Sequence, residues 1–110
     1  MSGKPDDTPT KTAKAREETE KVEQVIAYLN TKAGTHFKPG AKAHQRHIRG
    51  RLREGSEVED FKRAIVWCVS EWAEDADMER YIRPETIFSA SKFGGYVENF
   101  YRKQRRLDDE

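Results

Sequence analysis

The larger apolar residues of this chain are confined to one part of it. Every leucine, isoleucine, valine, phenylalanine, tyrosine and tryptophan lies between Val22 and Leu107, whereas residues 2–21 contain none of them. A folded core has to be built within this stretch, because burial of apolar surface is the main driving force of folding. We therefore expect a single domain over residues 14–107, after a flexible, disordered leader (1–13) with the composition of a linker and before an acidic tail (108–110).

Several classes of protein are excluded by composition. The longest uninterrupted apolar run, Ala64 to Cys68, is far shorter than the roughly 20 residues that cross a bilayer. The N-terminus lacks the apolar region of a secretory signal. A single cysteine allows neither an internal disulfide nor a multi-cysteine metal site. We therefore expect a cytoplasmic protein with no membrane partner, no metal and no cofactor.

The apolar residues recur at spacings of three and four, which predicts an all-α fold, a compact bundle of four to five helices. The first helix is expected over residues 14–33, with its apolar stripe from Val22 to Leu29 and Gly34 as its stop. The second is expected over residues 41–54, before Gly55.

The second half of the chain carries further helix signals. Ser56 and Glu59 have the spacing of a capping box at the start of a third helix, the expected spine of the core. Pro84 suits the first turn of a short helix that ends near Phe88. A last helix is expected to open near Ser91, and the pair Gly94-Gly95 within it indicates either a close helix contact or a later start.

Charge is segregated along the chain, although 21 basic and 20 acidic residues leave a net charge of only +1. Residues 35–53 contain no carboxylate, whereas residues 54–79 contain nine carboxylates and two cations, Lys62 and Arg63. The cations between residues 35 and 53 are Lys38, Lys42, Arg46, Arg49, Arg51 and Arg53. Those near the C-terminus are Arg102, Lys103, Arg105 and Arg106. The near-zero net charge thus does not argue against a nucleic-acid partner.

Four of these cations share one face of the second predicted helix. Lys42, Arg46, Arg49 and Arg53 fall within about 60° of one another on a helical wheel. Such a row suits successive phosphates of a nucleic acid; the alternative is a solvated face balanced by the acidic start of the third helix. The residues predicted to bind DNA are Lys38, Lys42, Arg46, Arg49, Arg53, Arg102, Lys103, Arg105 and Arg106.

Two aromatic residues are candidates for a partner surface or for stacking on unpaired bases. Trp67 and Trp72 lie about 140° apart on the third predicted helix, so Trp67 is expected to be partly exposed if Trp72 belongs to the core. Tyr101 flanks the apolar stripe of the last helix. The alternative for Trp67 is packing against another helix. His44, His47 and Cys68 are interpreted as polar surface and a buried small hydrophobe rather than as metal ligands or a nucleophile.

A combination of short motifs resembles a known family. These motifs are Leu52-x-Glu54-Gly55, Glu71-Trp72 and Arg83-Pro84-Glu85-Thr86-Ile87-Phe88. Together with the residues around them, over about residues 22–100, they resemble the conserved phage C-terminal domain of phage and prophage replication proteins. Many of those proteins are replisome organisers similar to DnaD-type primosomal proteins.

This resemblance implies a role in phage DNA replication and no catalytic residues. In the family a winged-helix DNA-binding domain commonly comes first, so the chain is expected to be a fragment of a longer protein or a stand-alone copy. Since no nucleophile triad, carboxylate pair or Walker motif is present, we do not expect an enzyme. The leading hypothesis is a DNA-binding accessory module. The alternative is a protein-interaction module that recruits a replicative helicase, a helicase loader or another primosome subunit through Trp67 or the acidic segment 71–79.

Overall fold

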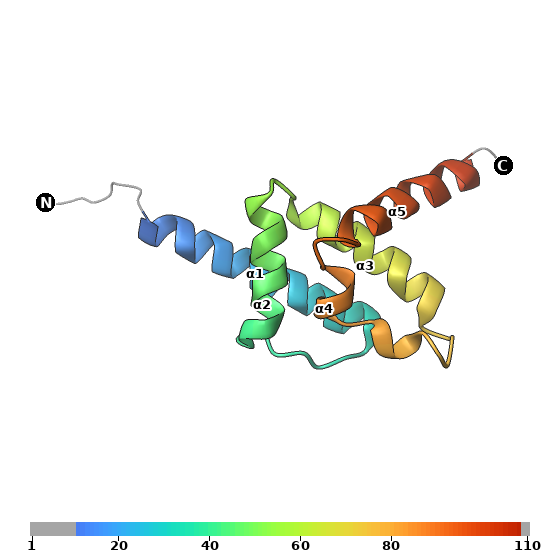
Figure 1. The fold of residues 1–110 in the computed structure, drawn as a ribbon, viewed down its shortest axis with the longest axis horizontal. Coiled ribbons are helices and arrows are strands. Elements are labelled where there is room, and N and C mark those ends of the chain that lie inside the picture. The colour runs from blue at the N-terminus through green and yellow to red at the C-terminus, as the bar shows by residue number, and fades with distance from the viewer. Residues whose placement is uncertain (1–10, 109–110) are drawn as a thin grey trace, which may run out of the picture.

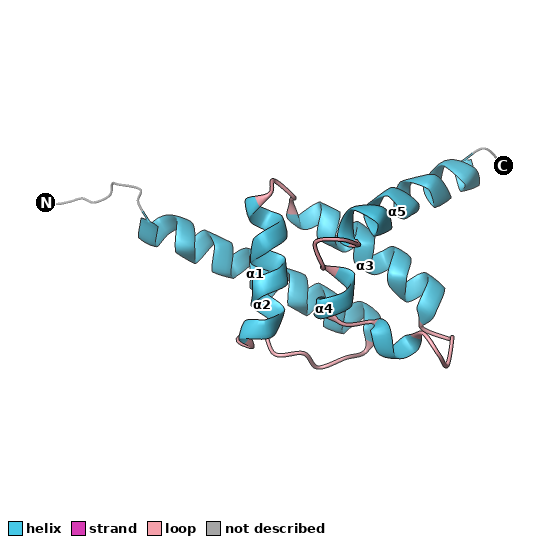
Figure 2. Ribbon diagram, viewed as in Figure 1, coloured by secondary structure: helices cyan, strands magenta, loops and turns pink. Residues whose placement is uncertain are grey.

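The computed structural model describes residues 11–108, and these form an all-α fold without a strand (Figure 2). The elements in chain order are α1 (Lys11–Ala33), α2 (Lys42–Arg53), α3 (Val58–Trp72), the short helix η2 (Glu79–Tyr81), α4 (Pro84–Ile87) and α5 (Phe93–Asp108). The predicted all-α fold class is confirmed. No helix among residues 11–108 is long and apolar enough to span a membrane.

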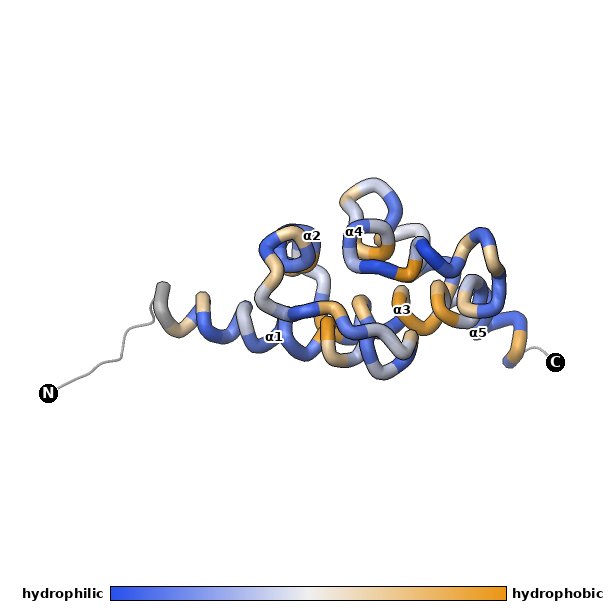
Figure 3. The backbone as a smooth tube through the Cα atoms, turned by 90° about the horizontal axis from the view of Figure 1, so that it is seen from below, coloured by the Kyte–Doolittle hydropathy of each residue, from blue (hydrophilic) through white to orange (hydrophobic). Residues whose placement is uncertain are grey.

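The helices form two layers. Figures 1 and 3 show α1, α3 and α5 in one layer, with α2 and α4 lying across it. Helix α3 contacts α1, α4 and α5, and α2 contacts α1 and α4. Figure 3 also shows hydrophobic residues concentrated along α3, between its neighbours. The third helix is therefore the spine of the core, as its apolar pattern predicts.

Aromatic and aliphatic side chains from all the α-helices build this core. On α1 the predicted stripe from Val22 to Leu29 is fully buried at its four inward positions. The ring of Phe61 on α3 contacts those of Phe88 and Phe93, with centroids 5.2 and 4.9 Å apart. The start of α3 thus packs against the end of α4 and the start of α5.

The first helix is longer at its start than predicted and ends where predicted. It begins at Lys11, so residues 11–13 of the expected leader belong to α1, while residues 1–10 lie outside the described residues. Its end is a left-handed turn: Gly34 has φ +71°, and the N–H groups of Gly34 and Thr35 both donate to the Asn30 carbonyl. Of the acidic tail, Asp108 closes α5, and residues 109–110 also lie outside the described part.

The start of α3 differs by one residue from the prediction. The capping box is made by Glu57 and Asp60 rather than by Ser56 and Glu59, with the Glu57 N–H donating to Asp60 Oδ2 at 3.0 Å. The reason is that the Ser56 N–H already donates to the Arg51 carbonyl in the turn that ends α2. Ser56 therefore belongs to the preceding turn.

The last helix starts later than Ser91. It begins at Phe93, which places Gly94 and Gly95 in its first turn. A Cβ added at either glycine would meet no atom within 4 Å. Of the two predicted alternatives, a later start therefore describes this pair, and a close helix contact does not.

Candidate nucleic-acid interface

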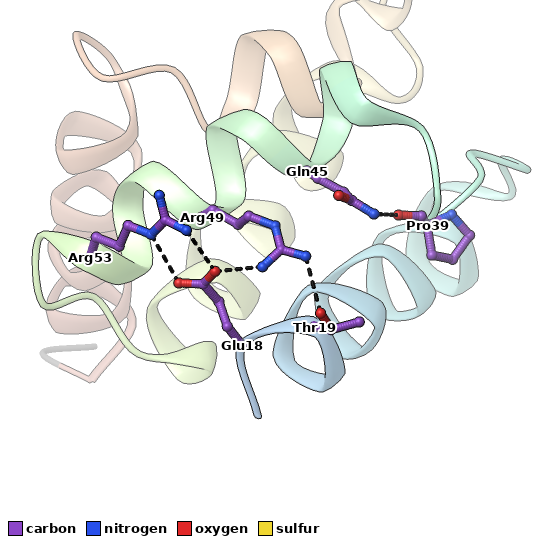
Figure 4. A network of polar contacts seen from close by, with 6 residues as sticks. All are labelled: Glu18, Thr19, Pro39, Gln45, Arg49 and Arg53. Carbon is purple, nitrogen blue, oxygen red and sulfur yellow. Dashed lines mark hydrogen bonds and ion pairs between the residues drawn. The ribbon is translucent and has the colours of Figure 1, made fainter. Parts of the chain in front are cut away.

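Two arginines of the predicted basic row on α2 are bound to an acidic residue of α1. The carboxylate of Glu18 accepts hydrogen bonds from Arg49 and from Arg53, the latter at 3.1 and 3.0 Å (Figure 4). Arg49 also donates to Thr19 Oγ1 at 3.1 Å. These bonds join the C-terminal half of α2 to α1, so both arginines have a structural role.

The ion pairs alter the acidity of the groups that make them. Hydrogen bonds from Arg53 and Arg49 lower the pKa of Glu18, against the opposing effect of partial burial. The same contact raises the pKa of Arg53. The carboxylate is therefore ionised at neutral pH and neutralises part of the basic row.

Sequence reasoning missed Glu18 because it looked for a counter-charge only within residues 35–53 and at the start of the third helix. A signal was present. Glu18 lies four residues before Val22 on the buried stripe of α1, a spacing that places both on one helix face. A carboxylate at the edge of an apolar stripe faces the neighbouring helix, and here that helix is α2 with its row of cations.

Three predicted cations remain without such a partner. Lys38, Lys42 and Arg46 are exposed, and none of them forms an ion pair with any residue in 11–108. Gln45 on α2 donates to the Pro39 carbonyl at 2.9 Å, which ties the loop carrying Lys38 to this helix (Figure 4). These three residues, Lys38, Lys42 and Arg46, are called the α2 cations below.

Arg51, the remaining cation of the second helix, is buried and serves the fold. Its guanidinium donates to both carboxylate oxygens of Glu54, at 3.0 and 2.9 Å, and to the Phe88 carbonyl at 3.1 Å. Arg51 and the motif residues Glu54 and Phe88 thus connect the end of α2 to the end of α4. Their role in this structure is to hold two helices together.

The C-terminal cations lie beside Trp67. A cleft of about 290 Å³ between α3 and α5 is lined by Trp67, Glu71, Asn99, Arg102, Lys103 and Arg106. Within it Lys103 Nζ lies 3.1 Å from Glu71 Oε2, and Arg102 donates to Asn99 Oδ1 at 3.4 Å. The cleft contains three cations and one carboxylate, so its net charge is positive. It is called the α3–α5 cleft below.

Trp67 belongs to a cluster of three aromatic rings. Its ring stacks on that of Tyr96 with centroids 5.7 Å apart, and the edge contact with Trp72 has a centroid separation of 6.1 Å. Trp72 and Tyr96 are 5.4 Å apart. All three are half-buried, and burial raises the pKa of Tyr96. Trp67 therefore both packs on α5 and lines the cleft, although its position on α3 is far from that of Trp72 around the helix.

Tyr101 and Arg105 do not line the α3–α5 cleft. Tyr101 is 38% exposed, and the guanidinium carbon of Arg63 lies over its ring, 5.2 Å from the ring centroid. Arg63 in turn pairs with Asp60 at 3.2 Å. Tyr101 is thus on a different side of α5 from the cations that surround Trp67.

The two basic regions lie apart. Figures 1 and 3 show the C-terminal half of α5 extending away from the body of the molecule, on the side opposite to α2. The α2 cations and the α3–α5 cleft therefore form two separate surfaces, and a ligand bound at one of them does not automatically contact the other.

The histidine and cysteine side chains have structural surroundings. His44 Nδ1 lies 3.0 Å from Glu85 Oε2, and the His44 ring meets Phe37 edge to face. Burial raises the pKa of the Cys68 thiol. Among the described residues no group of three histidine, cysteine or acidic side chains is placed to hold a metal ion.

Comparison with protein families identifies the domain. The family described as conserved phage C-terminus matches residues 25–98. The chain belongs to this conserved phage C-terminus family. The match lies within the stretch 22–100 on which the motif resemblance rests. It covers the core apart from Val22, and also α2 to α4 and the aromatic cluster, but it ends before Arg102. Searches of curated proteins and of solved structures found no match.

Proposed function

We propose that this phage domain is a non-catalytic accessory module of phage DNA replication that binds DNA in the cytoplasm of the bacterial host. The observation that carries the proposal is the α3–α5 cleft, where Trp67 from α3 lies with Arg102, Lys103 and Arg106 from α5. An aromatic side chain beside a row of cations is the arrangement with which proteins hold nucleic acid without reading its sequence. Membership in the conserved phage C-terminus family supports the phage setting.

The chemistry of the cleft favours contacts to phosphate. Arg102 and Arg106 are exposed and form no ion pair with a described residue, whereas Lys103 is shared with Glu71. Phosphate contacts position a nucleic acid but carry no sequence information. Binding is therefore expected to be weakly specific and strongly dependent on salt. The α2 cations provide a second, separate surface that a longer DNA could reach.

A salt titration of binding to labelled single- and double-stranded oligonucleotides tests this proposal. Each phosphate contact contributes about 0.7 to 0.9 to the slope of log K against log salt. We expect Arg102→Ala with Arg106→Ala to lower the slope by about 1.5, the loss of two such contacts. The matched control is Lys14→Ala with Arg16→Ala, which removes the same charge from exposed positions on α1.

Two results would refute the proposal. One is no binding of either oligonucleotide at low salt. The other is an equal change of slope in the control pair, since this would assign the attraction to net charge rather than to the cleft. Lys42→Ala with Arg46→Ala measures separately whether the α2 cations contribute.

A second candidate function, recruitment of a replicative helicase or helicase loader, rests on the acidic turn after α3. Glu74, Asp75, Asp77 and Glu79 are exposed and form no ion pair with a described residue. Asp75 organises the turn, because its Oδ1 accepts from the Asp77 and Met78 N–H groups.

Pull-down against the host helicase and its loader tests this second candidate. The variant Glu74→Lys with Asp77→Lys keeps Asp75 and so preserves the turn. We expect it to abolish capture, while Glu20→Lys with Glu23→Lys, at exposed positions on α1 with the same spacing, leaves capture intact. Capture that survives the first pair of substitutions would exclude the acidic turn as the contact.

A further inference from the structure

A second cavity lies on the other side of the aromatic cluster. It has a volume of about 450 Å³ and is bounded by the end of α3, the segment from η2 to α4 and the start of α5. Its apolar lining comes from Trp72, Met78, Tyr81 and Tyr96. A volume of this size lies in the range of small-molecule sites.

The rim of this cavity carries cations. Arg83 and Lys92 line it, both are exposed, and neither forms an ion pair with a residue that the structure describes. The guanidinium of Arg83 is 5.6 Å from the centroid of the Tyr81 ring, and its Nε donates to Thr86 Oγ1 at 3.0 Å. The lining contains one carboxylate, Glu85, whose Oε2 lies 3.0 Å from His44 Nδ1. The cavity therefore combines aromatic walls with a positive rim.

The lining also contains a hydroxyl group without a partner. Ser89 Oγ is buried and has no hydrogen-bond partner within the described part of the chain. A ligand that suits the cavity has a flat ring for Tyr81 and Trp72, a hydrogen-bonding edge for Ser89, and an anionic group for Lys92 and Arg83. A nucleotide has all three features.

This cavity and the α3–α5 cleft meet at the same three rings. Trp67 lines the cleft, and Trp72 and Tyr96 line the cavity. The centroids of the three rings are 5.4 to 6.1 Å apart. The two hollows are therefore the two sides of one aromatic cluster, with Arg102 and Arg106 beyond one side and Lys92 and Arg83 beyond the other.

We infer that the ligand is single-stranded DNA, which runs from the α3–α5 cleft across the aromatic cluster into this cavity. Unpaired bases stack on the rings, and the phosphates at the two ends meet the two groups of cations. A duplex does not expose the faces of its bases, so it can use the cations but not the rings. This inference rests on the proposed function and adds to it the strand form and a second half of the site.

The length of the oligonucleotide tests the inference. We expect the affinity of the full chain for oligo-dT to rise with length until both hollows are occupied. Tyr81→Leu with Lys92→Gln should weaken the binding of the long oligomers about tenfold, as for the loss of one stacked base. Arg102→Ala with Arg106→Ala, at the cleft end, should weaken the same long oligomers as well, because a strand that spans both hollows loses contacts at either end. Tyr28→Leu with Lys32→Gln, on α1 and outside both hollows, is the matched control.

Tryptophan fluorescence reports each end separately, because the chain has two tryptophans. In Trp67→Phe the remaining Trp72, which lines the cavity, should be quenched by the long oligomers. In Trp72→Phe the remaining Trp67, which lines the cleft, should be quenched by them as well. Circular dichroism confirms that each variant keeps its helical fold.

The outcomes separate the inference from the proposed function. Absence of any DNA binding refutes both. If Trp67 is quenched but Tyr81→Leu with Lys92→Gln changes the affinity at no oligonucleotide length, the inference alone is refuted. The cavity is then assigned to a protein partner. A duplex that binds as tightly as the single strand of equal length also refutes it, because the rings would then contribute nothing.

Discussion

The bond between α1 and α2 predicts a measurable effect of replacing Glu18 with glutamine. The Glu18 and Arg49 side chains are 19% and 22% exposed. Exposed ion pairs contribute about 0.2 to 1 kcal/mol to stability, and hydrogen bonds to charged groups contribute about 1.5 to 3 kcal/mol. The contribution of this partly buried pair is expected between these two ranges. We expect Glu18→Gln to lower the free energy of unfolding by about 1 kcal/mol, with the contact to exposed Arg53 left out of this figure. In a domain of this size that loss lowers Tm by about 4 to 8 °C.

The effect of Glu18→Gln should depend on pH in a defined direction. In the folded chain the arginines hold the pKa of Glu18 below its ordinary value of 4.5. A carboxylate with a lowered pKa stabilises the fold fully above its unfolded pKa, and this contribution is lost as the pH falls through the folded pKa. The difference in Tm between the original chain and Glu18→Gln should be full at neutral pH and shrink below about pH 4.5.

Thermal unfolding followed by circular dichroism, at neutral and at acidic pH, measures both effects. The matched control is Glu17→Gln, which removes the same charge from an exposed neighbour and should leave Tm within about 1 °C. Equal Tm values for Glu18→Gln and Glu17→Gln would refute the structural role of the Glu18 carboxylate. A loss of Tm that is equal at acidic and neutral pH would show that the charge of Glu18 is not responsible for it.

Other predictions concern the core, the turns and the thiol. Phe61→Ala removes a fully buried ring and should lower the free energy of unfolding by about 3 to 5 kcal/mol in denaturant titration; a loss below about 1 kcal/mol would contradict the packing described here. Arg51→Lys keeps the charge but cannot reproduce the two-pronged bond to the Glu54 carboxylate, so it should cost about 2 kcal/mol in the same titration. Gly34→Ala places a side chain at φ +71° and should cost about 1 to 2 kcal/mol, whereas Gly40→Ala, with no positive φ, should not. The buried thiol of Cys68, whose pKa is raised by burial, should react with a thiol reagent at mildly alkaline pH only as fast as the protein unfolds, and rapid labelling of the native protein would show otherwise.

Much of the fold follows from local patterns. The stripe on α1, the glycine stops at Gly34 and Gly55 and the proline at the start of α4 each depend on residues within a few positions of one another. Such signals predict where helices lie and which faces are buried. The error at the start of α3 arose where two local signals overlap, because Ser56 completes one turn and cannot also cap the next.

The candidate site depended on contacts that no local pattern contains. Arg49 and Arg53 look like part of a free basic row until Glu18, about thirty residues earlier, is seen to bind them. In the same way Arg102 and Arg106 line a cleft with Trp67 only because α3 packs against α5.

The order of residues along the chain decided the helices, the core and the segregation of charge, because helix formation and burial depend on periodic spacing. Only the tertiary structure decided which cations are neutralised and which remain available. Electrostatic pairing acts through space across about 3 Å, and the partner of Arg49 on another helix is invisible to any reading of the segment that contains it. The same packing placed Trp67, Trp72 and Tyr96 together between two hollows, and so turned separate aromatic residues into one surface.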